Sequence, residues 1–118
     1  MSKLKIYHNP RCSKSRATLE IIESKKAPVE IVNYLETPPS AAELDSLLRL
    51  LRLEPEQIVR KGEDRYEELG LEACPPKTRA EWIDVLVKNP ILIERPIVTD
   101  GRRAVLGRPP ENVQALLG

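Results

Sequence analysis

Aromatic residues and net charge are both scarce in this chain of 118 residues. It has no phenylalanine, one tryptophan and three tyrosines, so few rings are available to stack on nucleotide bases. The formal net charge is only +1, from 19 basic and 18 acidic residues. Such a balance provides no overall field toward nucleic acid or an anionic membrane. We therefore expect no nucleic-acid partner.

Long hydrophobic runs are also lacking. The longest, such as residues 85–87 and 91–93, fall far short of a membrane span. The N-terminus runs directly into a strand pattern rather than into a signal peptide. We expect a cytoplasmic protein with no membrane-spanning segment.

Two cysteines and one histidine limit the redox and metal chemistry. In a chain without a signal peptide, both cysteines are expected to stay reduced. Neither a Cys-x-x-Cys nor a His-x-x-x-His spacing is present, so a tetrahedral zinc site of the usual kind is not expected. The sequence predicts no metal and no bound cofactor.

The composition that remains is that of a packed protein. Hydrophobic residues make up 41% of the chain and charged residues 31%, and the length is typical of one domain. We expect a single domain over residues 1–118.

The order of predicted elements indicates an α/β fold. Residues 4–7 and 29–34 have strand patterns, and good helix formers run between them from Ser13 to about Lys26. A unit of this size predicts two parallel strands joined by a right-handed crossover.

Residues 40–89 are predicted to be a helical insertion. Ser40 is suited to cap a first helix, with Glu43 three residues later, and Thr78 is suited to cap another. After the insertion, the apolar runs at 91–93, 96–99 and 104–106 predict two or three strands, and a last helix is expected from Pro109-Pro110. This order is that of a thioredoxin-like fold, with a mixed four-stranded sheet flanked by helices.

Residues 8–16 contain the best candidates for catalysis. Cys12 lies between a strand and the first turn of a helix, where free backbone N–H groups and the helix dipole favour negative charge. With Arg11, Lys14 and Arg16 nearby, the pKa of Cys12 is expected to lie below the ordinary thiol value of about 8.5. We therefore predict a thiolate nucleophile at Cys12, rather than a small core residue, and an oxyanion site around it.

Two neighbours of Cys12 keep alternative interpretations. Ser15 could hydrogen-bond the sulfur, or, as a serine of the first helical turn, it could simply satisfy the backbone. His8 could act as an acid or base, or it could be a structural residue at the strand end. Because the loop has no second cysteine, an outside thiol must complete any redox cycle.

The active loop of the glutaredoxin-coupled arsenate reductases has the pattern His-Asn-Pro-x-Cys-x-x-Ser-Arg, which this chain resembles at His8-Asn9-Pro10-Arg11-Cys12-Ser13-Lys14-Ser15-Arg16. The similarity continues in order through residues 34–40, 59–61, 66–71, 89–98 and 107–110. It implies that the chain reduces arsenate, with glutathione as the reducing cosubstrate and glutaredoxin as the partner that resolves the mixed disulfide. We expect a monomer.

The resemblance also implies roles for individual residues. In that family three arginines surround the oxyanion or its adduct with the cysteine, as suits a planar fork that binds two oxygens and keeps its charge. Surface ion pairing is the alternative role for an arginine. A proline opposite the cysteine has a cis peptide bond in the family. The matching arginines are Arg60, Arg95 and Arg108, and we expect them, together with Ser15, to bind the substrate. His8, Asn9 and Pro96 are expected to support the site.

Two other functions remain as alternatives. Spx-type transcription factors, which bind RNA polymerase, share this fold and use a Cys-x-x-Cys pair in the corresponding loop, where Ser15 replaces the second cysteine. A glutathione-dependent oxidoreductase with another substrate would keep Cys12 without requiring the three arginines. Cys74 has no counterpart in the catalytic pattern of the arsenate reductases, and we interpret it as a bystander.

Overall fold

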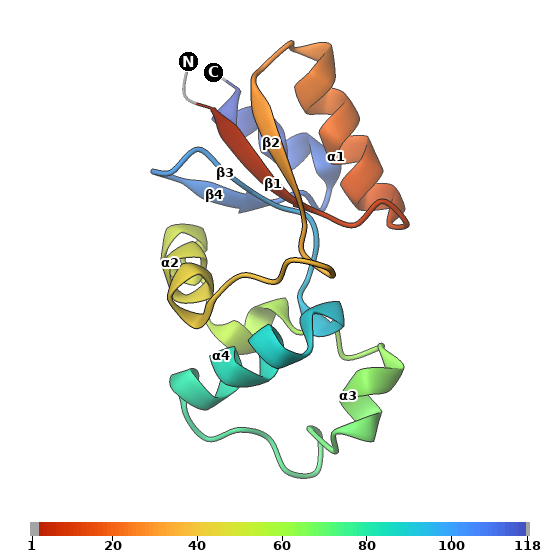
Figure 1. The fold of residues 1–118 in the computed structure, drawn as a ribbon, viewed down its shortest axis with the longest axis vertical. Helices are drawn as coiled ribbons and strands as arrows, with labels where there is room; N and C mark the ends of the chain where they lie inside the picture. Colours follow the sequence, from red (N-terminus) through yellow and green to blue (C-terminus); the bar gives the residue numbers. More distant parts are fainter. Residues whose placement is uncertain (1–2, 118) are drawn as a thin grey trace. The chain divides into compact units, whose positions relative to one another are not determined.

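The computed structural model describes residues 3–117, and the chain divides into two compact units (Figure 1). The first unit is Met1–Thr37 with Arg95–Gly118, and the second is Pro38–Glu94. The helical insertion expected at residues 40–89 therefore lies within the second unit. The expectation of one domain over residues 1–118 stays a prediction.

The first unit is built on a mixed sheet of four strands in the order β2-β1-β3-β4. The strands β1 and β2 are parallel, whereas β1 with β3 and β3 with β4 are antiparallel. This sheet and its flanking helices confirm the predicted thioredoxin-like arrangement. The bounds are β1 Leu4–His8, α1 Ser13–Ser24, β2 Val29–Asn33, β3 Ile97–Thr99, β4 Ala104–Leu106 and the 3-10 helix η3 Pro110–Leu116.

The core of the first unit lies where α1 and η3 pack on the sheet. The helix α1 makes the crossover between the parallel strands, and η3 lies beside it (Figure 1). Each buried aliphatic side chain of this core stabilises the fold by about 1.5–3 kcal/mol. The most buried members are Leu4, Ile6, Ile22, Val98 and Val113.

The second unit is helical. Ser40 Oγ accepts a hydrogen bond from the Glu43 backbone N–H at 3.1 Å, and Thr78 Oγ1 accepts one from Glu81 at 3.1 Å, so both predicted caps are confirmed. The bounds are α2 Ala41–Leu51, the 3-10 helix η1 Pro55–Ile58, α3 Asp64–Glu68, α4 Arg79–Lys88 and the 3-10 helix η2 Pro90–Leu92.

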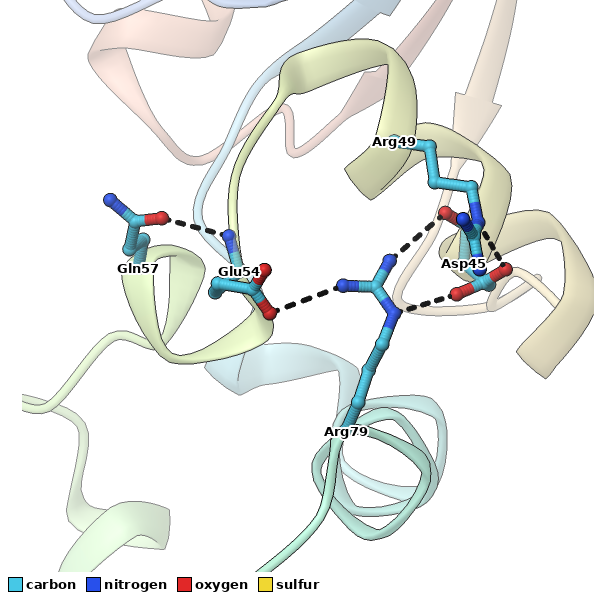
Figure 2. Close-up of polar contacts among 5 residues, drawn as sticks. All are labelled: Asp45, Arg49, Glu54, Gln57 and Arg79. Atoms are coloured by element: carbon cyan, nitrogen blue, oxygen red, sulfur yellow. Dashed lines mark hydrogen bonds and ion pairs between the residues drawn. The ribbon is translucent and has the colours of Figure 1, made fainter.

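An ion-pair network joins α2 to α4 in this unit, as Figure 2 shows. Arg79 places Nε 2.9 Å from Asp45 Oδ1 and Nη1 3.3 Å from Glu54 Oε2. Arg49 holds the other oxygen of Asp45 at 3.0 Å. Two guanidinium groups thus share the carboxylate of Asp45. Arg79 links the start of α4 to α2 through Asp45 and to the segment before η1 through Glu54.

Of the two or three strands predicted beyond Pro90, the structure has two, and residues 91–93 are not a strand. Pro90 opens a 3-10 turn there, and Ile93 forms only an isolated bridge with Val59. The fixed φ of proline suits the first position of a helical turn, so the run is apolar because it is buried rather than because it is a strand. Among residues 3–117, no helix is both long enough and apolar enough to cross a membrane.

Candidate active site

The loop after β1 brings Cys12 to the N-cap position of α1, with an extended backbone at φ −93° and ψ 123°. Two hydrogen bonds fix the turn: the Cys12 N–H donates to the Asn9 carbonyl at 3.0 Å, and the Arg11 N–H donates to Asn9 Oδ1 at 2.9 Å. Asn9 is itself buried. The sulfur of Cys12 therefore occupies the place where a capping side chain usually meets the free N–H groups of the first turn.

The environment of the partly buried sulfur favours the thiolate. Burial raises the pKa of Cys12, but the Ser15 backbone N–H, the Arg95 guanidinium and the Lys14 backbone N–H together lower it below its ordinary value. The predicted direction is confirmed. The physical causes differ in part from those expected, because the side-chain cation that lowers the pKa is Arg95 rather than one of the three cations in the loop.

Two arginines that are distant from Cys12 in sequence converge on it. Arg108 Nη1 lies 3.9 Å from Cys12 Sγ and donates a hydrogen bond to the Arg95 carbonyl at 3.1 Å. Arg95 is 8% exposed. The bonds Arg95-Pro96 and Arg108-Pro109 are both cis, so the cis-proline implied by the resemblance is present, and a second one accompanies it. The structure thus brings one thiol and two fixed cations together.

His8 and Ser15 form a buried pair beneath the loop. Ser15 Oγ accepts a hydrogen bond from the Asn9 N–H at 3.0 Å and lies 2.6 Å from His8 Nδ1. Of the two interpretations open for Ser15, these contacts match the second, because its hydroxyl satisfies the backbone while its own N–H faces the sulfur. Burial, helped by the charge of Arg16, lowers the pKa of His8 and so favours the neutral imidazole.

Arg60 belongs to the second unit. Its backbone N–H donates to the Leu92 carbonyl at 2.7 Å, and its Nη1 lies 2.7 Å from Glu94 Oε1. Glu63 lies on the other side of the guanidinium, with its Oε2 3.9 Å from Nε. Sequence reasoning missed Glu94, because the pair joins residues 34 positions apart and no local pattern marks it.

Cys74 is exposed in the second unit, and both cysteines are free thiols. Among residues 3–117, no group of three or more His, Cys, Asp or Glu side chains is arranged to hold a metal ion.

Comparison with known proteins gives a consistent result. The ArsC family model matches residues 7–116. An Escherichia coli protein named "Uncharacterized protein YfgD" is 45% identical, over 98% of each chain. An arsenate reductase of Neisseria meningitidis is 42% identical, over 99% of this chain and 100% of that one. The solved structure of an arsenate reductase from Vibrio cholerae has a TM-score of 0.90 at 40% identity, covering 97% of each chain.

Proposed function

Because this chain belongs to the ArsC family, we propose that it is an arsenate reductase with Cys12 as its nucleophile. The observation that carries the proposal is the thiolate-favouring site, in which the sulfur lies 3.9 Å from Arg108 and its pKa is lowered in part by Arg95. Relatives and solved structures named arsenate reductase, matched over nearly their whole length, support arsenate as the substrate.

In the first step, the Cys12 thiolate attacks the arsenic atom of arsenate. A sulfur–arsenic bond forms, an arsenic–oxygen bond breaks, and the oxygen leaves as hydroxide that solvent protonates to water. Arg95 and Arg108 hold the remaining oxygens and stabilise the charge that shifts during the displacement. The family resemblance implies Arg60 as a third arginine for the substrate, and within the second unit its guanidinium lies 2.7 Å from Glu94 Oε1.

In the second step, glutathione reduces the adduct. Its sulfur bonds to the sulfur of Cys12, the sulfur–arsenic bond breaks, and the bonding pair remains on arsenic, which falls from the +5 to the +3 state and leaves as arsenite. Glutaredoxin then reduces the mixed disulfide and restores Cys12. The reaction takes place in the cytoplasm, where glutathione keeps thiols reduced, and a monomer without a bound cofactor carries it out.

The buried residues beneath the loop act on the nucleophile through its backbone. Ser15 and His8 hold each other, and Ser15 also binds the Asn9 N–H, so the three residues fix the turn that presents Cys12. Pro96 continues the segment that carries Arg95. These residues position the thiolate and the arginine without contacting arsenic.

The test is arsenite production from arsenate by the purified protein with glutathione and glutaredoxin. Wild type should form arsenite, Cys12→Ser should form none, and Cys74→Ser should match wild type. If wild type forms no arsenite although Cys12 reacts rapidly with alkylating reagents at neutral pH, the nucleophile stands and the assigned substrate is wrong.

A further inference from the structure

Gly107 occupies a crowded position directly before Arg108. Its backbone N–H donates to the Pro96 carbonyl at 2.9 Å, and its own carbonyl oxygen lies 3.4 Å from Thr18 Oγ1. A Cβ added at Gly107 would overlap Thr18 Oγ1 and would lie 2.7 Å from Pro96 Cγ and 3.0 Å from Thr18 Cγ2. Real Cβ atoms essentially never show contacts under 3.0 Å, so a side chain at this position requires a neighbour to move.

The three segments that meet at Gly107 are those that carry the candidate active site. Thr18 stands on α1, whose N-cap is Cys12, and its Oγ1 also donates to the Lys14 carbonyl at 2.8 Å. Pro96 follows Arg95 directly, and Gly107 precedes Arg108. The close backbone approach at Gly107 is therefore a point where the positions of the nucleophile and both arginines are coupled.

Among the other glycines of residues 3–117, two are required by their backbone conformation rather than by close packing. Gly70 and Gly101 have φ of +65° and +92°, a conformation that L side chains rarely adopt, and an added Cβ would meet nothing within 4 Å. Gly62 is required neither by its backbone conformation nor by close packing, since its φ is not in the left-handed region and an added Cβ would meet nothing within 4 Å. Within the described part of the chain, Gly107 is the glycine required by close packing.

We infer that Gly107 is a positioning residue of the arsenate site, because its missing side chain sets the spacing between Cys12, Arg95 and Arg108. The inference rests on the proposed function for its substrate, but the effect of Gly107 on the reactivity of Cys12 can be measured without arsenate. For an alanine at 107 to make ordinary contact, its Cβ and Pro96 Cγ would have to separate by 0.7 Å, from 2.7 Å to 3.4 Å. Arg95 and Arg108 are bonded directly to Pro96 and Gly107, so this separation shifts at least one of the two arginines, and a misplacement of about 1 Å can reduce a rate by about 100-fold.

The decisive variant is Gly107→Ala, made together with Cys74→Ser so that Cys12 is the one cysteine left to react. Its folding is checked by circular dichroism and urea unfolding. The rate of Cys12 alkylation is measured against pH, and KM and kcat are measured for arsenate. We expect the alkylation profile to move to higher pH, the rate at pH 7 to fall several-fold, and KM for arsenate to rise about 10-fold or more.

Two further variants separate positioning from simple destabilisation. Gly62→Ala is the matched control and should leave the profile and KM at wild-type values. Thr18→Ala removes both Thr18 atoms that crowd the added Cβ, so the double variant with Gly107→Ala should recover part of the lost alkylation rate and KM. If Gly107 acted on stability alone, adding Thr18→Ala would not restore the alkylation rate or KM.

The outcomes are distinct. If Gly107→Ala folds and keeps the wild-type alkylation profile and KM, the inference is overturned. If Gly107→Ala does not fold, Thr18→Ala alone decides, because it loosens the same contact without adding an atom; a smaller change in the same direction supports the inference and no change overturns it. If wild type reduces no arsenate, the proposed function fails, while the alkylation profile still tests the positioning role.

Discussion

Removing the charge of Arg108 should slow the reaction of Cys12 with iodoacetamide at neutral pH. Arg108 Nη1 lies 3.9 Å from Cys12 Sγ. Opposite unit charges about 4 Å apart attract by about 1 kcal/mol in water, and by more where solvent is partly excluded. Since about 1.4 kcal/mol is a factor of ten in an equilibrium, Arg108→Met should reduce the thiolate fraction about fivefold at pH values below the pKa of Cys12.

The assay is the alkylation rate as a function of pH, in a Cys74→Ser background. The Arg108→Met profile should move to higher pH, because the thiolate loses a stabilising cation while the thiol is little affected. Arg102→Met is the matched control, since it removes the same charge from an exposed position in the turn between β3 and β4. The electrostatic reasoning is refuted if Arg108→Met, once shown to be folded, gives a profile that superimposes on that of wild type.

Three stability predictions follow from buried and ion-paired residues. Ser15→Ala should lower the free energy of unfolding by about 1–3 kcal/mol, because the buried Asn9 N–H loses its acceptor. Leu86→Ala should lower it by about 2–5 kcal/mol, because Leu86 is 0% exposed in the helical unit. Asp45→Asn should lower the urea midpoint at pH 7, because it removes a carboxylate charge that Arg49 and Arg79 bind. The hydrogen bond from Arg49, and to a smaller extent the one from Arg79, lowers the pKa of Asp45. A lowered folded-state pKa means that this stabilisation is present above the unfolded value of about 3.9 and is lost as the pH falls through the folded value, so wild type and Asp45→Asn should converge in acid.

Urea unfolding measures all three. A loss below about 0.5 kcal/mol for Ser15→Ala or Leu86→Ala is the size of an ordinary surface substitution and would contradict the assigned contact. A pH-independent difference between wild type and Asp45→Asn would contradict the role of the carboxylate charge.

Local patterns in the sequence predicted most of the fold. The strand, helix and strand at the N-terminus, the caps at Ser40 and Thr78, and the hairpin of β3 and β4 all depend on neighbouring residues, so a short window contains the information. The sequence left open whether residues 91–93 form a further strand, because an apolar run indicates burial without specifying the backbone that buries it.

The site was predictable where its chemistry is local. Cys12 stands at the start of a helix, and the part of its lowered pKa that comes from the Ser15 and Lys14 backbone N–H groups follows from that position. Arg95 and Arg108 entered through the family resemblance, since nothing in a local pattern distinguishes them from surface arginines. Gly107 was missed as a site residue because the contact that requires it, with Thr18, joins residues 89 positions apart. Such contacts arise only when the chain has folded.

The most direct test of the central claim is intact-mass spectrometry of the Cys74→Ser protein after incubation with arsenate and glutathione, without glutaredoxin. The account predicts that one glutathione becomes disulfide-bonded to Cys12, that this adduct appears only when arsenate is present, and that one arsenite is released for each adduct formed. Glutathionylation that proceeds equally without arsenate, or arsenite released while Cys12 stays unmodified, would contradict it.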